Sequence, residues 1–335
     1  MASKKPFEVS IELTTDCNYF CDFCFGKNFP KKAKQPKTGD LKKVIEKIAS
    51  EGINRIRFTG GEPLLRKDVG ELLSFAKEQG LFTSLNTNAS LLSRQKIKEL
   101  ANSLDDVLIS FHSLNEKQEQ FLAGKKELFD KKLNAIKLLS SEKVFVRAST
   151  ILSTQNIKQL EEFKSLVESL PISQWVLLRP IPNPGNLFPV SRKEIASAVE
   201  KILKFNAGKK ESERTLIENA LPFCCSNPKE VEKVALGGLR EDGHSTLFID
   251  AYLSIKPSYF LDLGLGNALK DSILDAWKNP FMKRMHALEF IAEQCHKCMH
   301  VKKCMGGSRF SALLVNGSLY ELDPLAAPNH SETYK

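Results

Sequence analysis

Residues 8–24 read EVSIELTTDCNYFCDFC and join a strand pattern directly to three cysteines. Glu8–Leu13 alternates between polar and apolar side chains, which predicts a half-buried β-strand. Because Cys17, Cys21 and Cys24 follow almost at once, we expect their thiols on the loop at the carboxyl end of that strand. Ligands of parallel α/β sheets bind at this end, so the loop is the first candidate for a functional site.

The strand pattern recurs along the chain, and helix patterns lie between the copies. The predicted strands are Glu8–Leu13, Arg55–Thr59, Phe82–Asn86, Asp106–Ser110, Val144–Thr150 and Gln174–Leu178. The predicted helices, with apolar residues at i, i+3 and i+4, are Asp40–Ser50, Val69–Gln79, Ser93–Ala101, Lys126–Ser140 and Ile157–Ser169. Repeated strand–helix units predict an α/β fold with a parallel sheet, either doubly wound or curled into a barrel.

The regular pattern ends at residues 179–186, which contain three prolines and a glycine. A helix pattern follows at Arg192–Phe205, and beyond it glycines become frequent and strand patterns short. We therefore expect a barrel domain at 1–190, a linker helix region at 191–220 and a small α+β domain at 221–335. The last segment has a short apolar core and several cysteines, so a metal would help to stabilise it.

The composition is that of a soluble globular protein, with 42% hydrophobic and 27% charged residues among 335. No apolar run approaches the ~20 residues that span a bilayer, and the first residues lack the apolar segment of a signal peptide. We therefore predict a cytoplasmic protein that does not enter a membrane. We interpret the net charge of +9 as solubility from lysine-rich helix faces, with attraction of an acidic peptide or nucleic acid as the alternative; we find no nucleic-acid-binding motif.

The eight cysteines fall into three clusters, at 17/21/24, 224/225 and 295/298/304. In a reducing compartment such clustering favours metal binding over disulfides. Zinc is the alternative to iron–sulfur at both triplets, because two cysteines separated by two residues also occur in structural zinc sites.

The first triplet has the donor set of an iron–sulfur cluster with one open iron. Three thiolates can hold three corners of a four-iron cubane, and no fourth cysteine is near. A pure electron carrier would use four cysteines, so the vacancy indicates chemistry at the iron. Phe23 lies between the last two cysteines and either packs over the loop or offers a flat surface to a nucleobase.

Residues 55–63, RIRFTGGEP, join the second predicted strand to a glycine pair. Gly60 and Gly61 permit close backbone approach, and Pro63 fixes the turn. The exposed backbone groups could bind an amino group with help from Glu62. The position at a strand end makes a ligand-binding loop more probable than a plain turn.

These motifs, namely Cys17-x3-Cys21-x2-Cys24 with Phe23 and the GGEP loop that begins at Gly60, resemble those of the radical S-adenosylmethionine (SAM) enzymes. The resemblance covers about residues 1–180 and implies a partial (βα)6 parallel barrel. It implies that the amino and carboxylate groups of SAM bind the open iron of a 4Fe–4S cluster. One electron, from a donor such as ferredoxin or flavodoxin, then yields a 5′-deoxyadenosyl radical that abstracts hydrogen from the substrate.

The same resemblance suggests cofactor contacts at later strand ends. It implies that Asn86 contacts the cofactor, that Ser110 lies near the ribose, and that Arg147 lies near the methionine carboxylate. The plainer alternatives are turn capping for the first two and an ion pair for Arg147. His112 and Arg179 are weaker candidates on the substrate side.

Near the C-terminus, Cys295-x2-Cys298-x5-Cys304 resembles the SPASM extension of radical SAM enzymes, which usually holds two auxiliary clusters. Three of the cysteines expected from that pattern are absent. In this sequence the corresponding positions are Ser258, Ser308 and Ala326. The chain therefore cannot supply two complete auxiliary clusters.

One auxiliary iron–sulfur cluster is plausible, with Cys225 as its fourth ligand and Cys224 as the alternative. An open iron is a further possibility, as is ligation by one of the side chains His296, His300 and Asp323. A structural zinc ion also fits three cysteines and a histidine. The pair at 224/225 could instead be buried small hydrophobic residues, or one of them a redox-active thiol.

The favoured function is radical SAM chemistry on a ribosomally made peptide, which is what many SPASM enzymes modify. One feature counts against it: Cys17 lies so near the start that we expect no leader-binding domain before the barrel. A small-molecule enzyme, such as a dehydrogenase or a tetrapyrrole-modifying enzyme, is the alternative. A non-catalytic iron–sulfur or zinc protein is the alternative of another class. The sequence does not specify the substrate or the oligomeric state.

Overall fold

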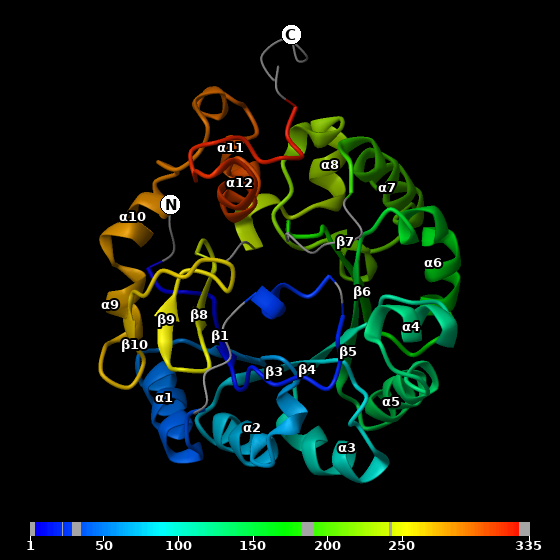
Figure 1. Cartoon of the computed structure of the whole chain (residues 1–335), viewed down its shortest axis with the longest axis vertical. Coiled ribbons are helices and arrows are strands. Elements are labelled where there is room, and N and C mark those ends of the chain that lie inside the picture. Colours follow the sequence, from blue (N-terminus) through cyan, green and yellow to red (C-terminus); the bar gives the residue numbers. More distant parts are fainter. Residues whose placement is uncertain (1–3, 22, 29–34, 183–189, 241–242, 328–335) are drawn as a thin grey trace.

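The strands of this protein form an open ring with helices around its outside, as Figure 1 shows. The computed structural model describes residues 4–21, 23–28, 35–182, 190–240 and 243–327. Within them the strands make one sheet in the order β10-β9-β8-β1-β2-β3-β4-β5-β6-β7. Neighbouring strands from β1 to β7 are parallel, so their carboxyl ends all lie at one edge of the ring.

The elements follow the expected alternation along the chain. The strands are β1 (Glu8–Glu12), β2 (Arg55–Thr59), β3 (Phe82–Thr87), β4 (Asp106–Ser110), β5 (Phe145–Ile151), β6 (Gln174–Leu178), β7 (Leu216–Ile217), β8 (Thr246–Ile249), β9 (Ser254–Lys256) and β10 (Gly266–Asn267). The helices are α1 (Thr38–Ser50), α2 (Val69–Glu78), α3 (Arg94–Leu100), α4 (Glu116–Ala123), α5 (Phe129–Ser141), α6 (Leu160–Glu168), α7 (Arg192–Phe205), α8 (Pro228–Val234), α9 (Ile273–Trp277), α10 (Pro280–His286), α11 (Val301–Cys304) and α12 (Arg309–Asn316).

The predicted α/β fold with a curled parallel sheet is confirmed, and all six predicted strands lie within two residues of their expected bounds. Helices α8 to α12 were not predicted individually, and among the helices α1 to α7 the exception is α4, which the sequence pattern did not reveal. Its residues EKQEQFLA include few apolar side chains. The helix is fixed instead by a cap, since the Asn115 side chain accepts a hydrogen bond from the Gln118 N–H at 3.0 Å.

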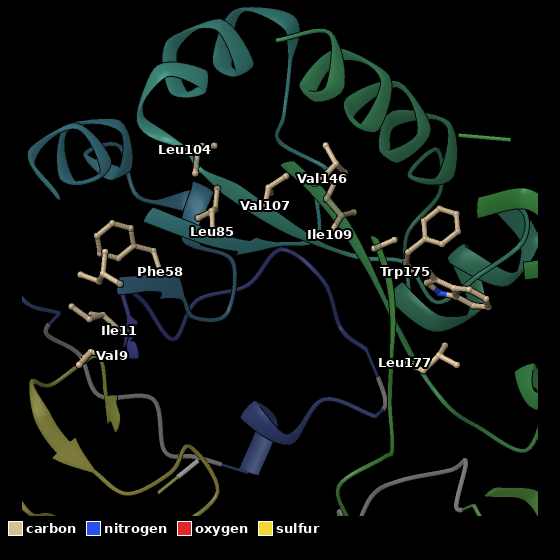
Figure 2. Close-up of a cluster of buried hydrophobic side chains, with 14 of the residues drawn as sticks. Val9, Ile11, Phe58, Leu85, Leu104, Val107, Ile109, Val146, Trp175 and Leu177 are labelled. Carbon is tan, nitrogen blue, oxygen red and sulfur yellow. The ribbon is translucent and has the colours of Figure 1, made fainter. Parts of the chain in front are cut away.

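The main hydrophobic core lies between the sheet and the surrounding helices. Figure 2 shows part of it, where apolar side chains of neighbouring strands point toward the helices. Val9 and Ile11 of β1, Phe58 of β2 and Leu85 of β3 are each 0% exposed. None of the helices in the described part of the chain has both the length and the hydropathy needed to cross a membrane.

The residues that alternate with this core on the same strands are polar and bond to one another. The Glu8 carboxylate lies 2.6 Å from the Arg57 guanidinium, which also donates to the Asn86 Oδ1 at 2.9 Å. The guanidinium of Arg147 lies 2.8 Å from the Asp106 carboxylate. Since successive strand residues point to opposite faces, these pairs lie on the face of the sheet away from the helices.

The sheet continues past both expected domain boundaries. Strand β7, in the predicted linker region, pairs with β6, and β8, in the predicted C-terminal domain, pairs in parallel with β1. β9 then adds to β8 as an antiparallel hairpin. The barrel sheet is therefore longer than the six predicted strands, and the C-terminal segment supplies one of its edges.

The carboxyl end of β1 is tied to the β8–β9 turn by the buried side chain of Glu12. Its carboxylate accepts a hydrogen bond from the Ala251 N–H at 3.0 Å. Burial raises the pKa of Glu12 from 4.5 to about 7, with Asp250 adding to the effect and Lys256 opposing it.

This raised pKa predicts a pH dependence of stability. The stabilising contribution is complete below pH 4.5 and is lost as the pH rises through about 7, since burying the charged form is unfavourable. At about 1.4 kcal/mol per pKa unit, the loss is about 3 kcal/mol. We expect Glu12→Gln to remove this part of the dependence in denaturant titrations at pH 5 and pH 8. Glu46 is exposed, so the control Glu46→Gln should leave the pH dependence of stability unchanged. An unchanged pH dependence in Glu12→Gln would contradict the prediction.

Candidate functional site

A cavity of about 430 Å³ opens at the carboxyl ends of the barrel strands. Cys17, Cys21 and Cys24 all line it, together with Phe23. We call it the cofactor cavity. The three predicted thiols are therefore brought to one site, where the parallel sheet places its ligands.

Two thiols in this loop, those of Cys17 and Cys21, are neutral without a bound cation. Burial raises the pKa of Cys21 to about 12, and the neighbouring Cys24 and Cys17 add to the shift. Burial also raises the pKa of Cys17. Only a metal centre would ionise such thiols near neutral pH, and thiolates are the ligands that iron–sulfur clusters use. Three thiols along one cavity suit a cubane, because each thiolate of such a cluster binds a different iron atom.

The glycine pair after β2 lies directly against the cysteine loop. The Gly61 N–H donates to the Thr14 carbonyl at 2.8 Å, and the Glu62 N–H donates to the Asp16 carbonyl at 2.7 Å. A Cβ at Gly60 would lie 2.5 Å from the Thr14 oxygen, and one at Gly61 would lie 2.2 Å from the Asp16 oxygen. Gly60 also has a φ of +153°. Both positions therefore require glycine for close packing, and both glycines line the cofactor cavity.

The side chain of Glu62 is directed toward β3. It is 0% exposed and accepts hydrogen bonds from the Thr87 hydroxyl at 2.8 Å and the Asn88 N–H at 2.8 Å. Burial raises its pKa. Pro63 is also buried and begins a short 3-10 helix, Pro63–Leu65. Glu62 thus joins the ends of β2 and β3, and direct contact of Glu62 or Pro63 with a cofactor stays a prediction.

The later strands place some of the expected residues in the cavity and not others. Asn86, Ser110, His112 and Arg179 line it. Arg147 is absent from the lining residues and pairs with Asp106 at 2.8 Å and with Glu218 at 3.4 Å. It lies near the amino end of β5, away from the ligand-binding edge. The ion pair that we gave as the plainer alternative for Arg147 is therefore present, and contact of this guanidinium with the cofactor stays a prediction.

A buried ion pair that the sequence reasoning missed also lines the cofactor cavity. The Lys132 ammonium of α5 lies 2.6 Å from the Glu119 carboxylate of α4, and the two side chains are 2% and 4% exposed. The sequence pattern could have identified Lys132, because it lies three residues after Phe129 and four before Ile136 and so shares their apolar face of α5. A lysine on the apolar face of a helix is a candidate for a buried charge.

The C-terminal segment contributes aromatic walls to the same cavity. Tyr259, Phe260 and Phe310 are among the lining residues. The Phe25 ring, just after the cysteine loop, packs edge to face on Phe260 with a centroid distance of 4.9 Å. The cofactor cavity is therefore completed by residues from the N-terminal and the C-terminal parts of the chain.

A second group of cysteines surrounds a small cavity in the C-terminal segment. Cys224, Cys295, Cys298 and Cys304 line it. Cys225, our preferred fourth ligand, is not among the lining residues, whereas the alternative Cys224 is, and which of the two binds metal stays a prediction. Burial raises the pKa of Cys224 to about 11, and that of Cys304 likewise, so these thiols also need a cation to ionise.

Two of the three alternative ligands, Asp323 and His300, have other partners. Asp323 is 1% exposed, lies 2.5 Å from the Arg179 guanidinium and accepts from the Ser308 N–H at 2.7 Å. His300 lies 3.5 Å from the Glu232 carboxylate. Ser308, at an expected cysteine position, instead caps α12 by accepting from the Ser311 N–H at 3.1 Å.

Comparisons with known proteins agree with this geometry. Residues 11–167 match the model of the radical SAM superfamily. The PqqA peptide cyclase of Bradyrhizobium diazoefficiens is 26% identical over 98% of this chain and 89% of its own. SuiB of Streptococcus suis, solved with SAM, has a TM-score of 0.80 at 19% identity, covering 96% of this chain and 77% of its own. The structure of anSMEcpe with AdoMet and the Kp18Cys peptide has a TM-score of 0.74 at 16% identity, covering 95% of this chain and 93% of its own.

The close contact at Gly61 predicts a specific defect in metal loading. We expect Gly61→Ala to lose most of the iron that Cys17, Cys21 and Cys24 take up, because the new Cβ would displace the Asp16 carbonyl. Overpacking of this kind costs about 1–3 kcal/mol. Iron and sulfide analysis after anaerobic reconstitution measures the loss. Gly39→Ala is the control, since its Cβ would meet nothing within 4 Å. Equal iron in the two variants would contradict the steric argument.

The lining of the small cavity predicts which cysteine of the adjacent pair binds metal. In a Cys17/Cys21/Cys24→Ala background, Cys224→Ala should lose the remaining metal and Cys225→Ala should retain it. Elemental analysis for iron and zinc reads out both the ligand and the metal. Loss of metal only from the Cys225 variant would reverse the assignment.

Proposed function

We infer the function from one premise: this chain belongs to the radical SAM superfamily and is a radical SAM enzyme. The family uses a 4Fe–4S cluster together with SAM. We propose that Cys17, Cys21 and Cys24 hold this cluster in the cofactor cavity. The observation that carries the proposal is the alignment of these three thiols along one cavity, beside the backbone of Gly60 and Gly61.

The cluster and SAM, when bound, supply the reductive cleavage that starts radical chemistry. The residues of this chain bind and enclose them. The glycine pair presents its backbone to the cavity, and Asn86 and Ser110 supply polar groups from β3 and β4. The aromatic side chains Tyr259 and Phe260 cover the cavity from the C-terminal side. Such a cover limits access of water, which would otherwise quench reactive species.

We propose a ribosomally made peptide as the substrate. Support comes from the PqqA peptide cyclases, since the relative from Bradyrhizobium diazoefficiens aligns over nearly the whole chain. The net charge of +9 would favour an acidic leader segment, through long-range attraction. A low-potential carrier such as ferredoxin or flavodoxin would donate the electron.

We further propose that residues 221–335 form an auxiliary-cluster domain beside the barrel at 1–190, with 191–220 as the connection. Cys224, Cys295, Cys298 and Cys304 provide four thiols around one small cavity, which is the ligand number of one complete cluster. The cysteines absent at Ser258, Ser308 and Ala326 remove the ligands for another.

The proposal predicts SAM cleavage by the anaerobically reconstituted protein. With dithionite and SAM, the wild type should form 5′-deoxyadenosine, measured by liquid chromatography and mass spectrometry. In a Cys17/Cys21/Cys24→Ala variant the rate of SAM cleavage should fall by more than about 100-fold, since these are the cysteines that line the cofactor cavity among the described residues. Cleavage at equal rates by the two proteins, or by neither, would contradict the proposed function.

The peptide assignment needs its own test. A synthetic precursor encoded beside the gene should lose two hydrogen atoms or change configuration when incubated with the active enzyme, as mass spectrometry and chiral analysis would show. Modification of a small molecule, with the peptide unchanged, would favour the alternative substrate class.

A further inference from the structure

A second cavity, of about 450 Å³, opens beside the cofactor cavity. We call it the side cavity. It lies between α4, the segment that joins β5 to the 3-10 helix Asn156–Gln159, and Pro180 after β6. Its volume is within the range of cavities that bind small ligands or a few residues of a peptide. None of the roles assigned above uses it.

The two cavities share a wall. Phe23, His112, Leu122, Ile151 and Pro180 line both. The rings of Phe23 and His112 pack edge to face, with centroids 5.0 Å apart. Because Phe23 directly precedes Cys24 in the chain, the side cavity begins next to the cluster loop. A molecule bound there could extend into the cofactor cavity over a short distance.

The side cavity is lined by apolar groups and neutral amides. Phe121 and Leu152 are apolar, and the amides are those of Asn115, Gln118, Gln155, Asn156 and Gln159. Lys117 is the only formally charged side chain among its lining residues. A carboxamide offers both a donor and an acceptor, as a peptide bond does. Charged groups other than one carboxylate near Lys117 would lose hydration there without a counter-ion.

His112 adds a fixed donor at the junction of the cavities. The Ile151 N–H donates to its Nδ1 at 3.3 Å, so the ring proton resides on Nε2. Burial, with a contribution from Lys132, lowers the pKa of His112 to about 3, and the ring is therefore neutral at physiological pH. A neutral imidazole with Nε2–H can donate to a carbonyl oxygen in either cavity.

We propose that the side cavity binds an apolar side chain and the adjoining peptide bonds of the substrate, next to the residue whose hydrogen is abstracted. This inference rests on the proposed peptide substrate. The exposed Phe121 ring extends the apolar surface to the rim, since 59% of it is accessible. His112 orients the backbone, so it is a positioning residue and takes no part in the chemical step. Several of the amides already bond within the protein, as Gln118 does to Gln159 at 3.1 Å, and they shape the wall of the cavity.

Binding of short capped peptides to the anaerobic holoenzyme tests the inference without turnover. The probes are Ac-Gly-Phe-Gly-NH2 and Ac-Gly-Lys-Gly-NH2, and their binding is followed by saturation-transfer NMR in the presence of SAM and without reductant. We expect the Phe probe to bind roughly ten-fold more tightly than the Lys probe, because the ammonium group would lose its hydration in a cavity whose charged lining residue, Lys117, is also a cation. Equal binding would overturn the proposal.

Variants locate the bound probe. Gln155 is exposed and lines only the side cavity, so Gln155→Trp should fill the mouth and weaken binding of the Phe probe by roughly ten-fold. Phe121→Ser should weaken it by a smaller factor. Gln120 is exposed on α4, next to Phe121, but does not line the side cavity. Gln120→Trp is therefore the matched control and should bind the Phe probe normally. Circular dichroism confirms that each variant is folded. Normal binding by both cavity variants would overturn the assignment.

Two further outcomes separate a failure of this inference from a failure of the proposed function. If raising the SAM concentration displaces the Phe probe, the side cavity belongs to the cofactor and the inference is wrong. If the probe binds as expected while the wild type fails to cleave SAM, the proposed function fails and the peptide-binding cavity stands.

Discussion

The backbone of Gly60 and Gly61 lies so close to the loop after β1 that neither position can carry a side chain. This contact joins the carboxyl ends of two adjacent parallel strands and fixes the loop that carries the first three cysteines. Glu62 extends the connection to β3 through buried hydrogen bonds. The position of the thiols therefore depends on the parallel sheet and on the absence of two Cβ atoms.

The two parts of the chain depend on each other at the same site. Strand β8 extends the barrel sheet beside β1, and Tyr259 and Phe260 line the cofactor cavity. On the other side of the ring, the buried pair of Arg179 and Asp323 connects the loop after β6 to the C-terminal segment. Loss of one partner would leave a buried charge without compensation, a large cost in folding free energy. Assembly of the barrel and of the C-terminal segment is thus coupled.

Much of this arrangement could be predicted from the sequence, for physical reasons. Apolar periodicity identified the strands β1 to β6 and most of the helices around them, because the core that selects them is continuous. It missed α4, whose residues are mostly polar and which is fixed by a cap at Asn115. With α4 it missed Glu119 and the ion pair with Lys132 in the cavity wall.

The choices that the sequence left open concern the direction of side chains rather than their position. Cys224 and Cys225 are adjacent, and only the path of the backbone decides which thiol faces the other cysteines. Arg147 lies on the predicted strand, but its surroundings are set by Asp106 and Glu218, which come from other strands or loops. No local pattern in a single sequence specifies such contacts, because they form between segments distant in the chain.

The central claim is that three thiols hold a cluster whose remaining iron binds SAM. Electron paramagnetic resonance of the dithionite-reduced Cys224→Ala variant, which by our proposal lacks the auxiliary cluster, tests it most directly. The account predicts a cluster signal whose g-values shift when SAM is added, and which is absent when Cys21 is also replaced by alanine. A signal that ignores SAM, or that survives loss of Cys21, would contradict it.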